Sequence, residues 1–261
     1  MPDAAFDHIA RAFDLRSRFI TFTRRCDTAR VSTMIDHAHD LARVREATER
    51  LLNAVAKMDN ASLAEPSRLP GWSRGHVLAH LARNADALVN VLRGRPMYVS
   101  AEARDADIER DASRPVEVQA ADLRESAARF QATGDEPADW TRTVELRNGV
   151  TDSASRVPFR RWAEVELHHV DLGTGYELED LPAEFLERET GFLADRFSGH
   201  ADVPATRLTD GTRAWSTGRA ADVPEITVTG RPADLVGWLA GRRDGAALEV
   251  RGGALPKLPP L

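Results

Sequence analysis

The sequence predicts an α+β protein with a helical bundle followed by a small α/β domain. Apolar residues recur at helical spacing up to about residue 180, with polar residues between them. Beyond about residue 200 the chain changes to short runs of β-favouring residues that end in glycine. With 261 residues it can bury a core that needs no disulfide or structural metal. We therefore expect a bundle over residues 34–180 and an α/β domain over residues 181–261.

Composition narrows the class of function. A formal charge of -6 argues against a general nucleic-acid binder, and the sequence has no apolar run of about 18 residues that could span a bilayer. Cys26 is the only cysteine, which excludes an intramolecular disulfide and a cysteine-based zinc site. We expect a cytoplasmic monomer that acts on a small molecule, with no nucleic-acid or membrane partner.

Residues 1–33 are predicted to be an N-terminal extension outside the core. They contain several arginines but no apolar signal-peptide core, and the acids Asp3, Asp7, Asp14 and Asp27 argue against a mitochondrial presequence. The clear helical pattern begins only after Met34. Two alternatives remain open: translation starts at Met34, or the segment forms a short accessory helix.

Four helices are predicted in the first half of the chain. The first covers about residues 40–58, where an apolar stripe faces charged residues. The segment EPSRLPGW then breaks the pattern, and Ser73 stands where an N-cap would begin a helix over about residues 74–93. Two further helices follow, at about 102–112 and 116–133.

The second half of the chain alternates between the two periodicities. The dipeptide Asn148-Gly149 predicts a tight turn, and a helix over about 157–172 is expected to stop at Gly173. Another helix is expected at about 182–198. Four short strands then follow, with a helix in ADLVGWLAG between the last two; the strands are in ATRLTDG, TRAWSTG, EITVTG and ALEVRGG.

Histidines and a glutamate at helical spacing predict a metal site. Side chains four apart lie on one helix face, as His76 and His80 do, and as Glu164 and His168 do. One carboxylate and two imidazoles suit zinc and leave a fourth position open. Either histidine of the first pair, taken alone, is more often structural, and His80 gains weight only when Glu164 and His168 lie beside it. His169 lies about 100° further round its helix from His168, away from the same ion.

These segments resemble a known family. The stretches RLPGWSRGHVLAHLARNADAL, PMYVSAEAR, RWAEVELHHVDLG and AGRRDG are similar to those of the mycothiol-dependent maleylpyruvate isomerases, members of the DinB-like superfamily. The histidine-containing blocks occur widely in that superfamily, whereas PMYVSAEAR is more particular to the isomerase. The resemblance covers almost all of the chain from about residue 40.

The resemblance implies a DinB-like four-helix bundle that binds Zn²⁺ through His80, Glu164 and His168. It also implies a catalytic role for Arg242, in the AGR motif of the C-terminal domain. Mycothiol would supply the thiol, which agrees with a chain that has no cysteine after Cys26.

The expected reaction is the cis-trans isomerisation of maleylpyruvate to fumarylpyruvate in gentisate-type aromatic degradation. Zinc would turn the thiol into a thiolate, which adds to the double bond; rotation and elimination follow. Arg242 would hold a carboxylate or enolate oxygen, because a guanidinium binds such groups bidentately. Two alternatives use the same fold: a mycothiol S-transferase acting on another electrophile, and a non-enzymatic metal-binding module.

Several nearby residues have competing assignments. Arg83 and Asn84, one turn after His80, are candidate mycothiol contacts. Asp171 is either a carboxylate that orients His168, or a helix cap or partner in a local salt bridge. The remaining aromatic and basic neighbours are expected to be structural: Trp72 as a packing anchor, Trp162 in the core or at an interface, and Arg160 and Arg161 in surface pairs or over the bundle end.

Overall fold

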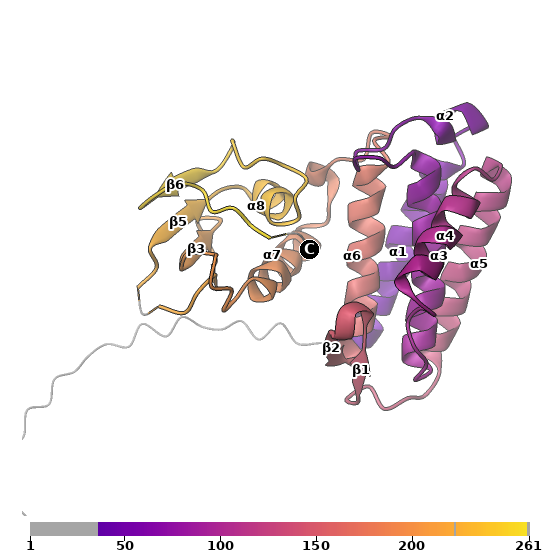
Figure 1. Ribbon diagram of the computed structural model, residues 1–261, viewed down its shortest axis with the longest axis horizontal. Coiled ribbons are helices and arrows are strands. Elements are labelled where there is room, and N and C mark those ends of the chain that lie inside the picture. Colours follow the sequence, from indigo (N-terminus) through magenta and orange to yellow (C-terminus); the bar gives the residue numbers. More distant parts are fainter. Residues whose placement is uncertain (1–35, 222, 260–261) are drawn as a thin grey trace, which may run out of the picture. The chain divides into compact units, whose positions relative to one another are not determined.

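The computed structural model describes residues 36–221 and 223–259, and four long helices form its bundle (Figure 1). Each helix packs against two of the others, in the cyclic order α1, α5, α3, α6. Their bounds are α1 His37–Val55, α3 Arg74–Leu92, α5 Val116–Asp135 and α6 Val157–Asp171. The predicted extension 1–33 and the choice of Met1 or Met34 as the start lie outside the described residues.

The helices begin at the residues that the sequence marks as caps. The Asp36 carboxylate accepts hydrogen bonds from the backbone N–H groups of Ala38 and His39 and so starts α1. Ser73, the predicted N-cap, starts α3 by accepting from the backbone N–H of His76. In return, the His76 ring accepts from the Ser73 backbone N–H, at 3.2 Å from Nδ1. This reciprocal pair fixes the first turn of the helix that carries His80.

Two shorter helices complete the first half of the chain. The helix α2 (Asn60–Ala64) is closed by a capping box between Asp59 and Ser62, and α4 (Ala101–Ala112) packs on α3. Gly75 makes the approach of α4 possible, because a Cβ there would lie 2.1 Å from the carbonyl oxygen of Ala112. Such a contact is far inside van der Waals distance, so a larger residue at position 75 would force the two helices apart.

A short hairpin precedes α6. Strands β1 (Thr143–Glu145) and β2 (Thr151–Ser153) pair antiparallel around the 3-10 turn η1 (Arg147–Gly149). Asn148 and Gly149 have φ of 60° and 71°, which is the left-handed geometry that the sequence indicated for a tight turn. A second 3-10 turn, η2 (Ala154–Arg156), leads into α6. The predicted tight turn is therefore confirmed, and it closes a hairpin.

The last third of the chain contains a four-stranded sheet and two helices. The strand order is β4-β3-β5-β6, with β3 and β5 parallel and the other pairs antiparallel. The helices α7 and α8 pack on each other. The elements are η3 Leu178–Asp180, α7 Ala183–Arg196, β3 Thr206–Thr209, β4 Ala214–Thr217, β5 Ile226–Thr229, α8 Pro232–Leu239 and β6 Glu249–Arg251. The predicted α+β class is confirmed.

The core continues from α6 into α7. Trp162 is fully buried and lies 5.1 Å from the ring of Phe185 between centroids, and Phe159 packs beside both. An ion pair adds to this contact, because Arg188 of α7 donates at 2.8 Å to the buried carboxylate of Asp40 on α1. No helix among the described residues is long and apolar enough to cross a membrane. The sequence-based boundary at residues 180 and 181 stays a prediction.

Candidate metal centre

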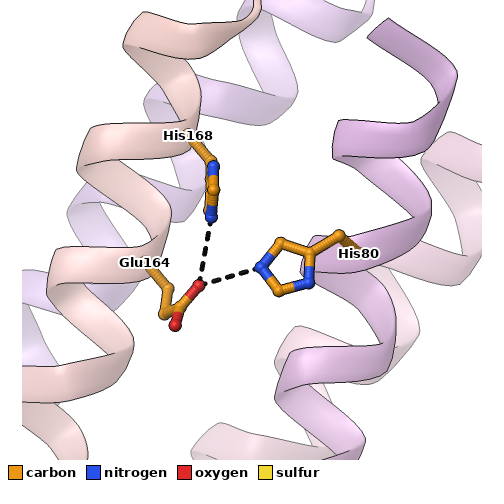
Figure 2. A group of neighbouring side chains, drawn as sticks. All are labelled: His80, Glu164 and His168. Carbon is orange, nitrogen blue, oxygen red and sulfur yellow. Dashed lines mark hydrogen bonds and ion pairs between the residues drawn. The ribbon is translucent and has the colours of Figure 1, made fainter. Parts of the chain in front are cut away.

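Three predicted metal ligands meet between α3 and α6 (Figure 2). His80 projects from α3, while Glu164 and His168 project from successive turns of α6. One side-chain atom of each residue lies within 4.8 Å of the corresponding atoms of the other two. His80 is 6% exposed, so the meeting point lies inside the bundle.

The donor atoms have the spacing that a small cation requires. Oε2 of Glu164 lies 3.0 Å from Nε2 of His80 and 3.2 Å from Nε2 of His168. Donors around a tetrahedral zinc are about 3.4 Å apart, given zinc–ligand distances of about 2.1 Å. The imidazole rings are 4.7 Å apart and nearly perpendicular, at 84°, so both Nε2 atoms approach one point without a ring clash. The three residues fit a zinc ion that keeps one further coordination position.

At two of the three residues, His80 and Glu164, electrostatics favour the charge state that binds metal. Burial lowers the pKa of His80 to about 4, so its ring is neutral near pH 7 and has a lone pair to give. Burial alone would raise the pKa of Glu164, but hydrogen bonds with His168 and His80 outweigh burial and hold it well below its usual range. A half-buried carboxylate beside a neutral imidazole attracts a cation.

Asp171 holds the other side of His168. Its Oδ2 lies 2.8 Å from Nδ1 of His168, and the carboxylate is completely buried. Burial opposes the charge on His168, but the hydrogen bonds with Asp171 and Glu164 outweigh it and raise the pKa of that ring. A hydrogen on Nδ1 leaves Nε2 free to face the cation position, which is how carboxylates commonly orient metal-binding histidines. Of the assignments for Asp171, the structure contains the contact with His168 and a salt bridge, which is made with Arg242 rather than with a local partner.

Arg242 reaches the same carboxylate from the C-terminal part of the chain. Its Nη2 donates to Oδ2 of Asp171 at 2.8 Å and its Nε to Oδ1 at 3.2 Å, while Nη1 donates to the Ala240 carbonyl at 2.7 Å. One N–H of each terminal nitrogen has no part in these bonds, since each carries two. Arg242 is thus linked to His168 through Asp171, a connection that the sequence did not indicate.

The other two histidines of the sequence clusters have different neighbours. Nε2 of His76 lies 3.1 Å from Glu109, and its Nδ1 belongs to the Ser73 cap, so His76 is a helix-start residue. His169 is buried and stacks on the Tyr176 ring at 4.1 Å between centroids. Burial lowers the pKa of His169 to about 4.

The two candidate mycothiol contacts are held by protein groups. Nη2 of Arg83 donates to both oxygens of Asp122, at 2.6 and 2.7 Å. Asn84 is 2% exposed, and its Oδ1 accepts from Nη1 of Arg161 at 2.7 Å. These bonds tie α3 to α5 and to α6. The hydrogen bonds and ion pairs of these two side chains do not include His80, Glu164 or His168.

The expectation that Arg161 lies at the surface was wrong. Arg161 is fully buried and donates to the Leu81 carbonyl and to Asn84, and burial lowers its pKa to about 10. Its neighbour Arg160 does form the predicted pair, with Asp152 at 2.6 Å. Among the aromatic residues, Trp162 lies in the core, and the Trp72 ring lies 5.5 Å from that of His80. Trp72 therefore packs against the candidate centre as well as the turn.

Two residues of the segment PMYVSAEAR also lie at the centre. Nη2 of Arg104 is 3.3 Å from Nδ1 of His80, and the Arg104 guanidinium lies 5.9 Å from the centroid of the Tyr98 ring. Burial raises the pKa of Tyr98. The resemblance includes this segment, but no periodicity in a loop and a helix start indicates which of its side chains turn inward.

A known family matches the part of the chain that contains the candidate metal centre. Residues 44–173 match the family model described as the mycothiol maleylpyruvate isomerase N-terminal domain. A crystal structure of a mycothiol-dependent maleylpyruvate isomerase is 28% identical, with a TM-score of 0.77 over 87% of this chain and 97% of that one. A variant of such an enzyme, with a histidine replaced by alanine, gives 27% identity at the same TM-score and coverage. No curated protein matches this chain in sequence. The chain belongs to the mycothiol maleylpyruvate isomerase family.

Proposed function

We propose that this protein is a mycothiol-dependent isomerase that converts maleylpyruvate to fumarylpyruvate. The observation that carries the proposal is the likeness to the solved isomerase, which covers 97% of that enzyme and is not confined to the metal-binding bundle. The likeness extends well beyond the 44–173 match, into the part of the chain that contains Arg242. The corresponding cellular role is one step in a gentisate-type pathway of aromatic degradation.

We propose that His80, Glu164 and His168 hold a Zn²⁺ ion. Support comes from the convergence of one carboxylate oxygen and two imidazole nitrogens, and from the burial that keeps His80 neutral. Bound zinc would lower the pKa of a thiol and make its thiolate abundant at neutral pH. Asp171 keeps His168 in the required orientation, and Trp72 packs beside His80 and keeps water from that ring.

In the proposed reaction the substrate and product have the same atoms and bonds and differ only in the geometry about one double bond. The mycothiol thiolate adds to an alkene carbon of maleylpyruvate, and the electron pair of the double bond moves to the conjugated carbonyl oxygen as an enolate. The former double bond is now single and rotates. The enolate then reforms the carbonyl and expels the thiolate, which leaves the trans double bond of fumarylpyruvate. Mycothiol is regenerated and no oxidant is needed.

Arg242 is the proposed catalytic residue for this sequence of steps. Two of its N–H groups hold Asp171, and the free N–H groups on Nη1 and Nη2 remain to donate to the enolate or a carboxylate oxygen. Its guanidinium can stabilise the enolate as the negative charge develops. One guanidinium would then support both the His168 orientation and the substrate.

The mycothiol contacts are proposed at the α3 side of the centre. Arg83 has the exposure for a direct contact, since 23% of its side chain is accessible. Asn84 is buried and would act through Arg161, which it holds in place. Both lie one turn beyond His80 on the same helix.

One assay tests the proposed function. Zinc-loaded protein is mixed with mycothiol and maleylpyruvate, and the product is separated chromatographically. Fumarylpyruvate at a rate that requires both thiol and metal supports the isomerase. A stable thioether adduct in place of fumarylpyruvate would identify an S-transferase, and neither product would favour a metal-binding module. His169→Ala is the control, because that ring packs on Tyr176 and should leave the rate unchanged.

A further inference from the structure

The guanidinium of Arg104 lies beside His80 on the side away from Glu164. Nη2 of Arg104 lies 3.3 Å from Nδ1 of His80, while Nε2 of the same ring faces Glu164. The Arg104 side chain is only 12% exposed. Its Nη1 is paired with the exposed Asp105 at 2.6 Å, and the ring of Tyr98 lies beneath the guanidinium. A largely buried cation therefore stands directly behind a proposed metal ligand.

The hydrogen-bonding rules make this contact incompatible with metal binding through Nε2. A guanidinium only donates, so an Arg104 bond to His80 needs a lone pair on Nδ1 and places the ring hydrogen on Nε2. A cation held by Nε2 requires the opposite arrangement, with the hydrogen on Nδ1. The two donors then face each other, and Nη2 of Arg104 is left without an acceptor at 3.3 Å from the ring. A buried donor without a partner is costly, so the site is incomplete until an acceptor arrives.

The charges point to an anionic acceptor. Arg242 is already compensated by the buried Asp171 carboxylate, to which it donates twice. The carboxylate that pairs with Arg104 is that of Asp105, whose side chain is 63% exposed and therefore well screened by water. Maleylpyruvate carries two carboxylates, and a guanidinium binds a carboxylate in a planar bidentate pair. Arg104 offers the charge and the geometry for one of the two.

We propose that Arg104 binds a carboxylate of the substrate and that Tyr98, packed against the guanidinium, positions it for this contact. The inference rests on the proposed function, whose dicarboxylate substrate it requires. The two residues of PMYVSAEAR that lie at the centre are Tyr98 and Arg104. The segment would thus select the substrate, while α3 and α6 hold the metal.

Equilibrium binding of a non-isomerising ligand tests this assignment. Maleate, a cis dicarboxylate, is titrated by calorimetry into zinc-loaded protein without mycothiol, so that no reaction intervenes. Arg104→Met should weaken maleate binding about 10- to 100-fold, the usual range for losing a hydrogen bond to a charged group. Arg104→Lys keeps the charge but not the bidentate fork, and should weaken binding by a smaller factor. The matched control is Arg110→Met on the same helix, whose side chain is 62% exposed and pairs with Asp107 and Asp111.

Zinc affinity distinguishes this role from a structural one. If Arg104 only supported His80, Arg104→Met would bind zinc more weakly; removing a cation beside a ligand should instead leave zinc affinity unchanged or increase it. Unaltered maleate affinity, weaker zinc binding, or failure of the unsubstituted protein to bind maleate would each overturn the proposal. If Arg104→Met does not fold, the Arg104→Lys titration decides. Maleate binding without maleylpyruvate isomerisation would contradict the proposed function alone.

Discussion

Replacing Asp171 with asparagine should weaken zinc binding without removing a metal ligand. Asp171 accepts hydrogen bonds from two donors, His168 and Arg242, both at 2.8 Å to Oδ2. An asparagine offers one acceptor oxygen and one donor amide, so one contact becomes donor against donor. Losing a charge-assisted hydrogen bond costs about 1.5–3 kcal/mol, which corresponds to a zinc affinity lower by roughly 10- to 100-fold. This agrees with the usual effect of removing a carboxylate behind a metal-bound histidine.

The stability cost of the same substitution has to be separated from its effect on zinc. Asp171 is completely buried and Arg242 is 16% exposed, so an unpaired guanidinium should lower the free energy of unfolding by about 2–3 kcal/mol. Asp234→Asn is the matched control, because that buried carboxylate is also held by two arginines, Arg231 and Arg243. Zinc affinity is measured by competition with a chromophoric chelator, and unfolding by urea titration. Equal zinc affinity in Asp171→Asn and the unsubstituted protein would refute the reasoning.

Three further predictions concern single side chains. His80→Ala should abolish stoichiometric zinc binding, measured by atomic absorption, whereas His76→Ala should retain it and lose only about 1 kcal/mol with its cap; the reverse result would reassign the ligand. Arg242→Ala should keep its zinc yet lower kcat at least about 100-fold, the usual cost of an oxyanion donor, and an unchanged kcat would remove it from the mechanism. Burial raises the pKa of Glu189 to about 8, so its carboxyl keeps its proton in the folded protein while the unfolded chain releases it near pH 4.3. Stability should therefore fall from pH 5 to 8 by a few kcal/mol, a fall that Glu189→Gln would remove; parallel urea-unfolding curves for both proteins across that range would contradict this.

The elements of the fold were predictable because each has a local cause. Ser73 caps α3, Asn148 and Gly149 adopt the left-handed turn, and Gly173 follows α6 with φ of 65°. The helix α2 was not predicted, since five residues are too few to establish a period. Its Asp59–Ser62 capping box was the available signal.

The candidate site was only partly predictable, because the residues around the three proposed ligands are brought there by tertiary contacts. Spacing on one helix placed Glu164 beside His168, but nothing local indicated that Arg242 would meet Asp171 across 71 residues of sequence. Arg161 was expected at the surface because arginine is costly to bury. Its partners, the Leu81 carbonyl and Asn84, come from another helix and lie beside it only after the bundle has formed.

The glycine at position 75 has a consequence for how this family can vary. It lets α4 lie against α3, so the distance between Arg104 and His80 depends on a residue that belongs to neither the metal centre nor the segment 96–104. A methyl group added at position 75 would push α4 away from α3, and with it the Arg104 side chain, while the three proposed metal ligands stay in place. A relative with a larger residue at this position could keep all three ligands and still accept a bulkier or differently charged electrophile.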